Sequence, residues 1–171
     1  MKIMYLITTA LLLLVFPNLY SQDFEVPEEY TLKVAEDYAK YEKDIIEASK
    51  WLKSTPLDQQ LYKRKEVSAF VMKWVNGSPT VNVELNETIF NFEKKNKGML
   101  ILFMAGCAQY VLENNYSKDM RAKHKFALNG MIEVYKIGKG IKKDKKMEKL
   151  IKSFEDGKGD EWLSENLKVN I

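Results

Sequence analysis

The sequence predicts an all-α fold, a bundle of about five to six helices around a central apolar helix at residues 98–115. From Met99 to Leu112 nearly every side chain is apolar on all faces, and such a helix must be surrounded by other groups. Glycine and proline are few, with 8 and 4 copies, and fall mostly between segments with helical periodicity. Hydrophobic residues make up 46% of the chain, which is enough to fill a core.

The central apolar run is too short to cross a membrane, because a spanning helix needs about 20 apolar residues. Three lysines precede the run and Gln109 interrupts it, which favours the interior of a bundle over lipid. Gly106, beside Ala105 and Ala108, predicts that another helix packs closely here, since a mid-helix glycine costs about 1 kcal/mol relative to alanine. We therefore expect that the protein, once its leader has been removed, is not an integral membrane protein.

Residues 1–22 predict a secretory signal peptide, and residues 23–171 a single all-helical domain. Lys2 is followed by an apolar stretch from Ile3 to Phe16 and then by the small residue Ser21. The large leucine that lies two positions before Ser21 leaves open the alternative of an uncleaved anchor. The expected setting is exported, either periplasmic or extracellular.

Two amphipathic helices are expected before residue 80. The first begins at Pro27–Glu28, where proline and carboxylates favour a helix start, and its apolar stripe continues to Leu52. Pro56 ends it, because the residue before a proline is disfavoured in helical geometry. The second runs from Leu57–Asp58 to Val75.

Residues 80–85 alternate apolar and polar side chains, which predicts a short extended connector packed on the bundle. Asn86 is expected to cap a helix before the central one, and Ser117 the helix after it. Asp144 is expected to cap a further short helix, and Asp160 to start a last amphipathic turn.

The residues form no recognisable catalytic, cofactor-binding or metal-binding constellation, so we expect no enzyme, cofactor or metal. Cys107 is the only cysteine, and its place in the apolar helix indicates a small buried side chain rather than an activated thiol. His124 is the only histidine and is expected at the edge of the core, one turn before Leu128. Gly138 and Gly140 lack the spacing of a phosphate-binding loop.

The charge of the chain is uneven, with a net value of +3 and lysines concentrated in residues 139–149. This segment is either a solvated helix face or a contact for a polyanion or an acidic membrane. An exported setting argues against nucleic acid as the partner. Trp51 and Trp162, if exposed, are the first residues to test as a contact site.

Two functions fit these observations. The first is a non-catalytic module that binds a protein or a surface of the cell envelope. The second is a periplasmic carrier of a lipid-like or other apolar small molecule, held in a cavity along the central helix. The side chains expected to line that cavity are Met99, Phe103, Met104 and Cys107.

Three features support a resemblance to known proteins: a leader that ends in YSQ, a lysine-rich composition, and the segments GMLILFMAGCAQYVLENN and MEKLIKSFEDGKGDEWL. In these features the chain resembles uncharacterised exported small all-helical proteins of Bacteroidetes type. The resemblance implies a periplasmic or extracellular location. It implies no activity and assigns no functional residue.

Overall fold

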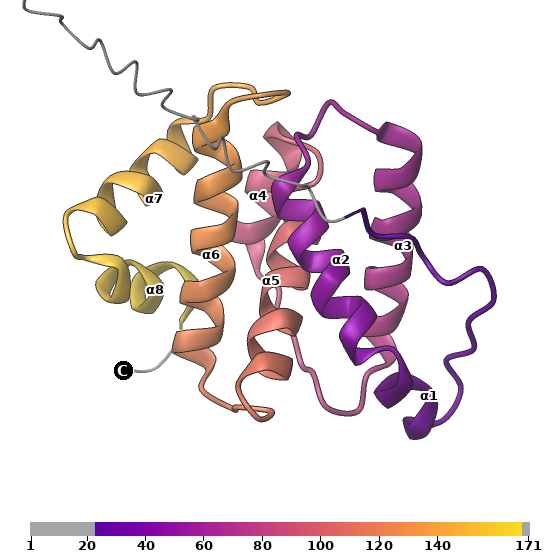
Figure 1. Ribbon diagram of the computed structural model, residues 1–171. Coiled ribbons are helices and arrows are strands. Elements are labelled where there is room, and N and C mark those ends of the chain that lie inside the picture. The colour runs from indigo at the N-terminus through magenta and orange to yellow at the C-terminus, as the bar shows by residue number, and fades with distance from the viewer. Residues whose placement is uncertain (1–22, 169–171) are drawn as a thin grey trace, which may run out of the picture.

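The computed structural model describes residues 23–168 and confirms the predicted all-α bundle (Figure 1). The predicted signal peptide lies outside the described residues. Within them the chain forms eight helices and no strand. The helices are α1 (Ala35–Lys40), α2 (Glu42–Ser54), α3 (Leu61–Gly77), α4 (Glu87–Lys95), α5 (Met99–Glu113), α6 (Met120–Ile137), α7 (Lys145–Glu155) and α8 (Gly159–Leu167).

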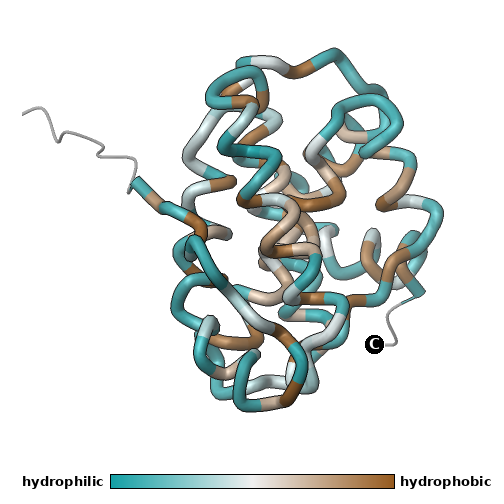
Figure 2. Tube along the Cα trace, turned by 90° about the vertical axis from the view of Figure 1, so that its right-hand side faces the viewer, coloured by the Kyte–Doolittle hydropathy of each residue, from teal (hydrophilic) through white to brown (hydrophobic). Residues whose placement is uncertain are grey.

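Helix α5 is the centre of the fold, as its apolar sequence predicted. It packs against α2, α3, α4 and α6, and eleven of its fifteen residues are buried. Figure 2 shows hydrophobic residues on the inward sides of the helices and hydrophilic residues along the outer turns. The polar Gln109 is accommodated because its amide accepts a hydrogen bond from Ser49 and donates one to Glu113, each at 3.0 Å.

Gly106 lets α5 and α6 approach at backbone distance, as the sequence predicted. A Cβ atom at this position would lie 2.8 Å from Cα of Ala127 and 3.1 Å from its Cβ, closer than such atoms pack. The absence of a side chain on α5 therefore sets the distance between the two helices.

The predicted start of the first helix at Pro27–Glu28 is wrong, because aromatic contacts hold this part of the chain against α3. The ring of Tyr30 lies 4.9 Å from that of Phe70, and Phe24 stacks on the same ring at 6.3 Å. The helix begins at Ala35, and the Asp37 carboxylate accepts hydrogen bonds from the backbone N–H groups of Lys33 and Val34 just before it. It is also interrupted at Tyr41, so one predicted helix becomes α1 and α2.

The second helix begins at Leu61 rather than at Leu57–Asp58. The buried Arg64 explains the delay, because its guanidinium donates hydrogen bonds to the carbonyls of Leu52, Thr55 and Pro56. These bonds hold residues 55–60 as a loop folded over the end of α2. Burial lowers the pKa of Arg64 to about 10, so the guanidinium stays charged near neutral pH.

The structure confirms two of the three predicted caps, and it corrects the third and the predicted start of the last helix. Asn86 accepts a hydrogen bond from the Ile89 N–H group at 3.2 Å, and Asp144 caps α7 by accepting one from Lys146 at 2.8 Å. Ser117 does not cap α6, because Asp119 does so through the N–H group of Ala122 at 2.9 Å. The last helix begins at Gly159, one residue before the predicted Asp160.

The extended connector at residues 80–85 is confirmed. Val81 is buried, Val83 and Leu85 are half-buried, and the alternate residues Asn82 and Glu84 are exposed. The connector thus lays one row of apolar side chains on the bundle without pairing as a strand.

Candidate functional site

Three loops lie together at one end of the bundle. The α6–α7 loop packs so tightly on the α2–α3 loop that a Cβ atom on Gly140 would lie 2.7 Å from the Asp58 nitrogen. The α4–α5 loop joins them through the buried Asn96, whose amide donates to the Lys142 carbonyl at 2.9 Å. The same amide accepts from the Lys142 N–H group at 2.7 Å. This pair of bonds fixes the position of α4 relative to α7.

The joined loops assemble a group of lysines that we call the lysine cluster. Its members, from the last turn of α4, the α6–α7 loop and the first turn of α7, are Lys94, Lys95, Lys143, Lys145 and Lys146. They surround a shallow hollow of about 590 Å³. Residues 139–149 were singled out in the sequence, but the contribution of α4 was not predicted.

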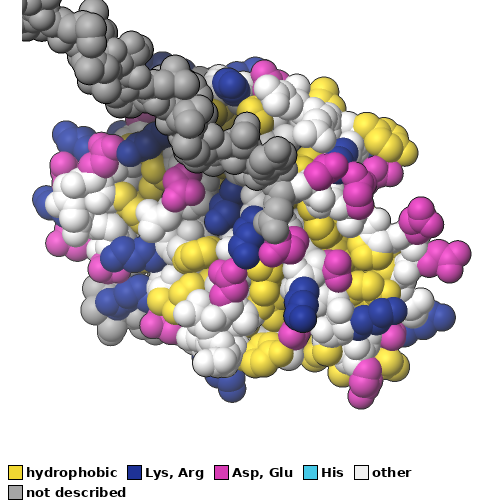
Figure 3. All heavy atoms as spheres, in the orientation of Figure 1, with side chains coloured by type: hydrophobic (Ala, Val, Ile, Leu, Met, Phe, Trp, Pro, Cys, Tyr) yellow, Lys and Arg dark blue, Asp and Glu magenta, His cyan; other side chains and the backbone are white. Residues whose placement is uncertain are grey.

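Little negative charge opposes the lysine cluster. Glu148 lies 3.6 Å from the Lys143 ammonium, which is the cluster's only ion pair within residues 23–168. Asp144 also lines the hollow, but it is buried and its carboxylate caps α7. On the face drawn in Figure 3, by contrast, basic and acidic side chains are interspersed. The lysine cluster is thus richer in positive charge than the face drawn in Figure 3.

Two exposed apolar side chains lie at the same end, in the first turn of α3 that follows the α2–α3 loop. Leu61 is 64% exposed and Tyr62 is 77% exposed. The next residue, Lys63, binds the carboxylates of Asp23 and Glu25, each at 2.5 Å. The described chain thus begins at the end of the bundle that carries the lysine cluster.

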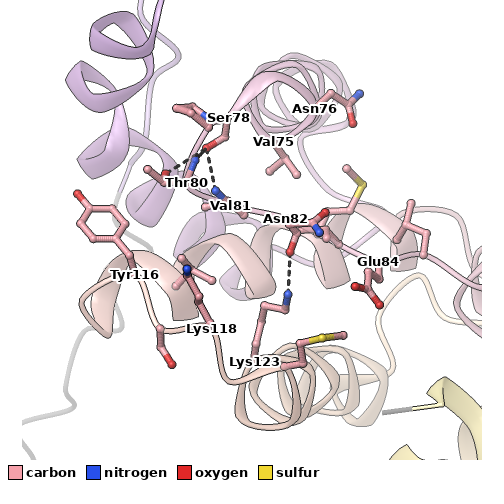
Figure 4. A pocket seen from close by; sticks show the side chains of 17 residues that line it. Val75, Asn76, Ser78, Thr80, Val81, Asn82, Glu84, Tyr116, Lys118 and Lys123 are labelled. Carbon is pink, nitrogen blue, oxygen red and sulfur yellow. Dashed lines mark hydrogen bonds between the residues drawn. The ribbon is translucent and has the colours of Figure 1, made fainter. Parts of the chain in front are cut away.

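A second hollow, of about 820 Å³, lies at the other end of α6 (Figure 4). The connector forms one wall, and the end of α3, the side of α5 that carries Met104 and Val111, the α5–α6 loop and the first turn of α6 form the others. Lys123 projects from α6 and its ammonium donates to the Asn82 carbonyl at 2.7 Å. Lys118 and Tyr116 lie on one side of it and Glu84 toward the other.

No protein-family model, curated protein or solved structure matches this chain. Between residues 23 and 168, no three His, Cys, Asp or Glu side chains lie together in a group that could hold a metal ion. No helix in this stretch is both long enough and apolar enough to cross a membrane. The lysine cluster and the second hollow are therefore the features on which a functional proposal can be based.

The two side chains examined for catalysis both lie in the core. Burial raises the pKa of the Cys107 thiol to about 12, so the nucleophilic thiolate is suppressed at neutral pH. His124 is 2% exposed rather than at the core edge, and neither ring nitrogen has a partner in the described part of the chain. Burial, helped by the charge of Lys123, lowers the pKa of His124 to about 4.

The four residues predicted to line a cavity along α5 do not lie together around any one cavity. Met99, Phe103 and Cys107 are fully buried against other side chains, and only Met104 reaches the second hollow. A row of apolar residues on a helix looks the same in the sequence whether it packs a core or lines a cavity. The distinction depends on which helices cover it.

The two tryptophans proposed as contact residues both pack against other side chains of the bundle. Trp51 is 1% exposed and lies beside the charged groups of Lys63 and Arg64, each within 6 Å of its ring. Trp162 is half-buried and stacks on Phe92 with ring centroids 6.4 Å apart. The exposed aromatic side chains at the end of the bundle that carries the lysine cluster are instead Tyr62 on α3 and Phe90 on α4.

Proposed function

We propose that this protein is an exported, non-catalytic binding domain that docks on an anionic membrane surface of the cell envelope. The observation that carries the proposal is the lysine cluster, in which five ammonium groups from the end of α4, the α6–α7 loop and the start of α7 share one shallow hollow. Only Lys143 has an ion-pair partner within residues 23–168. The cluster is thus available to an external anion.

The physical basis is the attraction between ammonium groups and the phosphates of lipid headgroups. Each lysine near an anionic membrane contributes about 1 kcal/mol, and the attraction is screened beyond about 8 Å at physiological salt. A shallow hollow places several ammonium groups within this distance of a flat surface. An enclosed pocket would not.

Two neighbouring features support a membrane rather than a soluble anion. Leu61 and Tyr62 are exposed at the same end, and such side chains are suited to the boundary between headgroups and acyl chains. The predicted leader joins the described chain at Asp23, which Lys63 holds at this end. If the leader is kept as an anchor, it would present this end, with the lysine cluster, to the membrane.

Co-sedimentation with lipid vesicles tests the proposal. We expect binding to vesicles rich in phosphatidylglycerol, decreasing as salt is raised, and little binding to phosphatidylcholine alone. The variant K95Q/K143Q/K146Q should bind the anionic vesicles about a hundredfold less tightly, from about 1 kcal/mol for each lysine.

The control K33Q/K40Q/K43Q removes the same charge from exposed residues around α1 and should bind like the wild type. Equal binding to neutral and anionic vesicles, or an undiminished affinity of the first variant, would overturn the proposal. Binding to an acidic protein instead of vesicles would show that the lysine cluster recognises a different partner. A carrier function is the second candidate, favoured by the hollow beside Met104.

A further inference from the structure

The second hollow contains a buried positive charge without a negative partner. Lys123 is 6% exposed, and its one hydrogen bond from the ammonium goes to the Asn82 carbonyl. No carboxylate of residues 23–168 lies within ion-pair distance of it. An ammonium has three donors, and buried charges in proteins are usually paired. An anion in the hollow would supply the missing partner.

The charges around the hollow favour an anion at one side. Lys118 is exposed and has no ion pair in the described structure. Like Tyr116, it lies in the loop between α5 and α6 and lines the hollow. The Asp119 carboxylate caps the first turn of α6 here, so the positive charge on this side of the hollow comes from the side chains of Lys118 and Lys123. Glu84, the acidic residue of the hollow, lies toward the other side (Figure 4). The hollow is therefore cationic where α6 begins.

The deeper surface of the hollow is apolar. Four apolar side chains from α3, the connector and α5 border it, and each residue as a whole is at least nine-tenths buried: Val75, Val81, Met104 and Val111. Methionine side chains adapt to the shape of a hydrocarbon ligand. The volume of about 820 Å³ lies within the range of about 300–1,000 Å³ typical of small-molecule sites.

We propose that this hollow binds a single-chain anionic amphiphile, such as a fatty-acid anion. The head group lies against Lys123 and Lys118, and the hydrocarbon chain lies along Val81, Met104 and Val111. This site is separate from the lysine cluster and does not depend on membrane docking. It also differs from the cavity expected along α5, because Met104 is the only residue that the two share.

Isothermal titration of the purified protein with decanoate, below its micellar concentration, tests the site. We expect one decanoate per protein and at least tenfold weaker binding of the neutral decanol, because a charge-assisted hydrogen bond is lost. Decyl phosphate distinguishes the source of the head group. Tighter binding of the phosphate indicates a phospholipid-derived ligand, and tighter binding of decanoate a free fatty acid, and both support an anionic amphiphile.

The variant K123M replaces the ammonium by an unbranched apolar side chain one atom shorter, and it should bind decanoate at least tenfold more weakly. The control K125M removes a lysine from the same helix that pairs with Asp160 at 2.9 Å outside the hollow, and should bind like the wild type. K118M, at an exposed position, should weaken binding several-fold and tests the site even where K123M does not fold.

Equal affinity for decanol and decanoate, or wild-type affinity in a folded K123M, would overturn this proposal. Absence of any binding by decanoate and decyl phosphate to the wild-type protein would also overturn it. The variant K95Q/K143Q/K146Q should keep its decanoate affinity, so failure of the membrane proposal and failure of this one are separable.

Discussion

Gly106 shows how a single missing side chain sets the packing of two helices. Gly106→Ala places a Cβ atom 2.8 Å from the Ala127 backbone, so α6 must shift and we expect a loss of about 1–3 kcal/mol in the free energy of unfolding. Gly130→Ala is the matched control, because there the added atom meets only the flexible Lys53 side chain at 3.0 Å. The control should be neutral or gain up to about 1 kcal/mol in helix propensity. Urea denaturation of both variants measures the difference, and equal stabilities would contradict the packing described.

His124 makes the stability of the fold depend on pH in a defined window. The unfolded chain binds a proton at an ordinary imidazole pKa of 6.5, whereas burial lowers the pKa in the folded protein to about 4. The stability that depends on a neutral His124 is therefore fully present above pH 6.5. As the pH falls toward 4, the free energy of unfolding decreases by up to about 3 kcal/mol.

His124→Leu should remove this part of the pH dependence, and it should raise the stability because both ring nitrogens lack partners. His124 is the only histidine of the chain, so no other imidazole contributes to the window. Thermal unfolding of both proteins between pH 4 and pH 7 checks the result. An unchanged difference between the two across this range would show that the imidazole is not buried in its neutral form.

At the level of elements, Asn96 connects two loops that hold the lysine cluster together. Asn96→Ala removes both hydrogen bonds to Lys142 and leaves two backbone groups without their partner, at a cost of about 2 kcal/mol. We expect weaker binding to anionic vesicles although no charge is removed, because the lysines of α4 and α7 are no longer held together. The exposed Asn129→Ala is the control. Unchanged vesicle affinity in Asn96→Ala would show that the arrangement of the cluster is unimportant.

The sequence predicted those elements whose determinants are local. Asn86 and Asp144 cap helices through backbone groups two or three residues away, and the alternation of residues 80–85 is visible in the chain itself. The start of α1 was missed because Tyr30 packs on Phe70, a contact between distant parts of the sequence. Single-sequence periodicity carries no information about such contacts.

The candidate sites were less predictable than the fold for the same reason. Residues 139–149 are visibly rich in lysine, but Lys94 and Lys95 join them only through the Asn96–Lys142 contact. The charge of Lys123 is unpaired because the connector places the Asn82 carbonyl, and no carboxylate, against its ammonium. Burial and the absence of a counter-ion follow from tertiary packing, so neither had a signal in the sequence.

For the whole molecule, the enclosure of α5 is the condition for stability. Phe103 is fully buried, and Phe103→Asp would place an unpaired carboxylate in the core at a cost of several kcal/mol. We expect this variant to be unfolded when examined by circular dichroism. Tyr62→Asp, at a side chain that is 77% exposed, should keep the wild-type melting temperature. A folded Phe103→Asp with an unchanged melting temperature would show that this face of α5 is in contact with water.

Hydrogen exchange measured with and without vesicles rich in phosphatidylglycerol tests most directly whether one enclosed bundle docks through one end. We expect slow exchange across α5 in both states, because its backbone is enclosed by α2, α3, α4 and α6. On the vesicles, additional protection should be confined to the loops at residues 95–98 and 138–144 and to the first turns of α3 and α7. Protection of α1 and the start of α2 instead, or fast exchange across α5, would contradict the proposed orientation and the fold on which it depends.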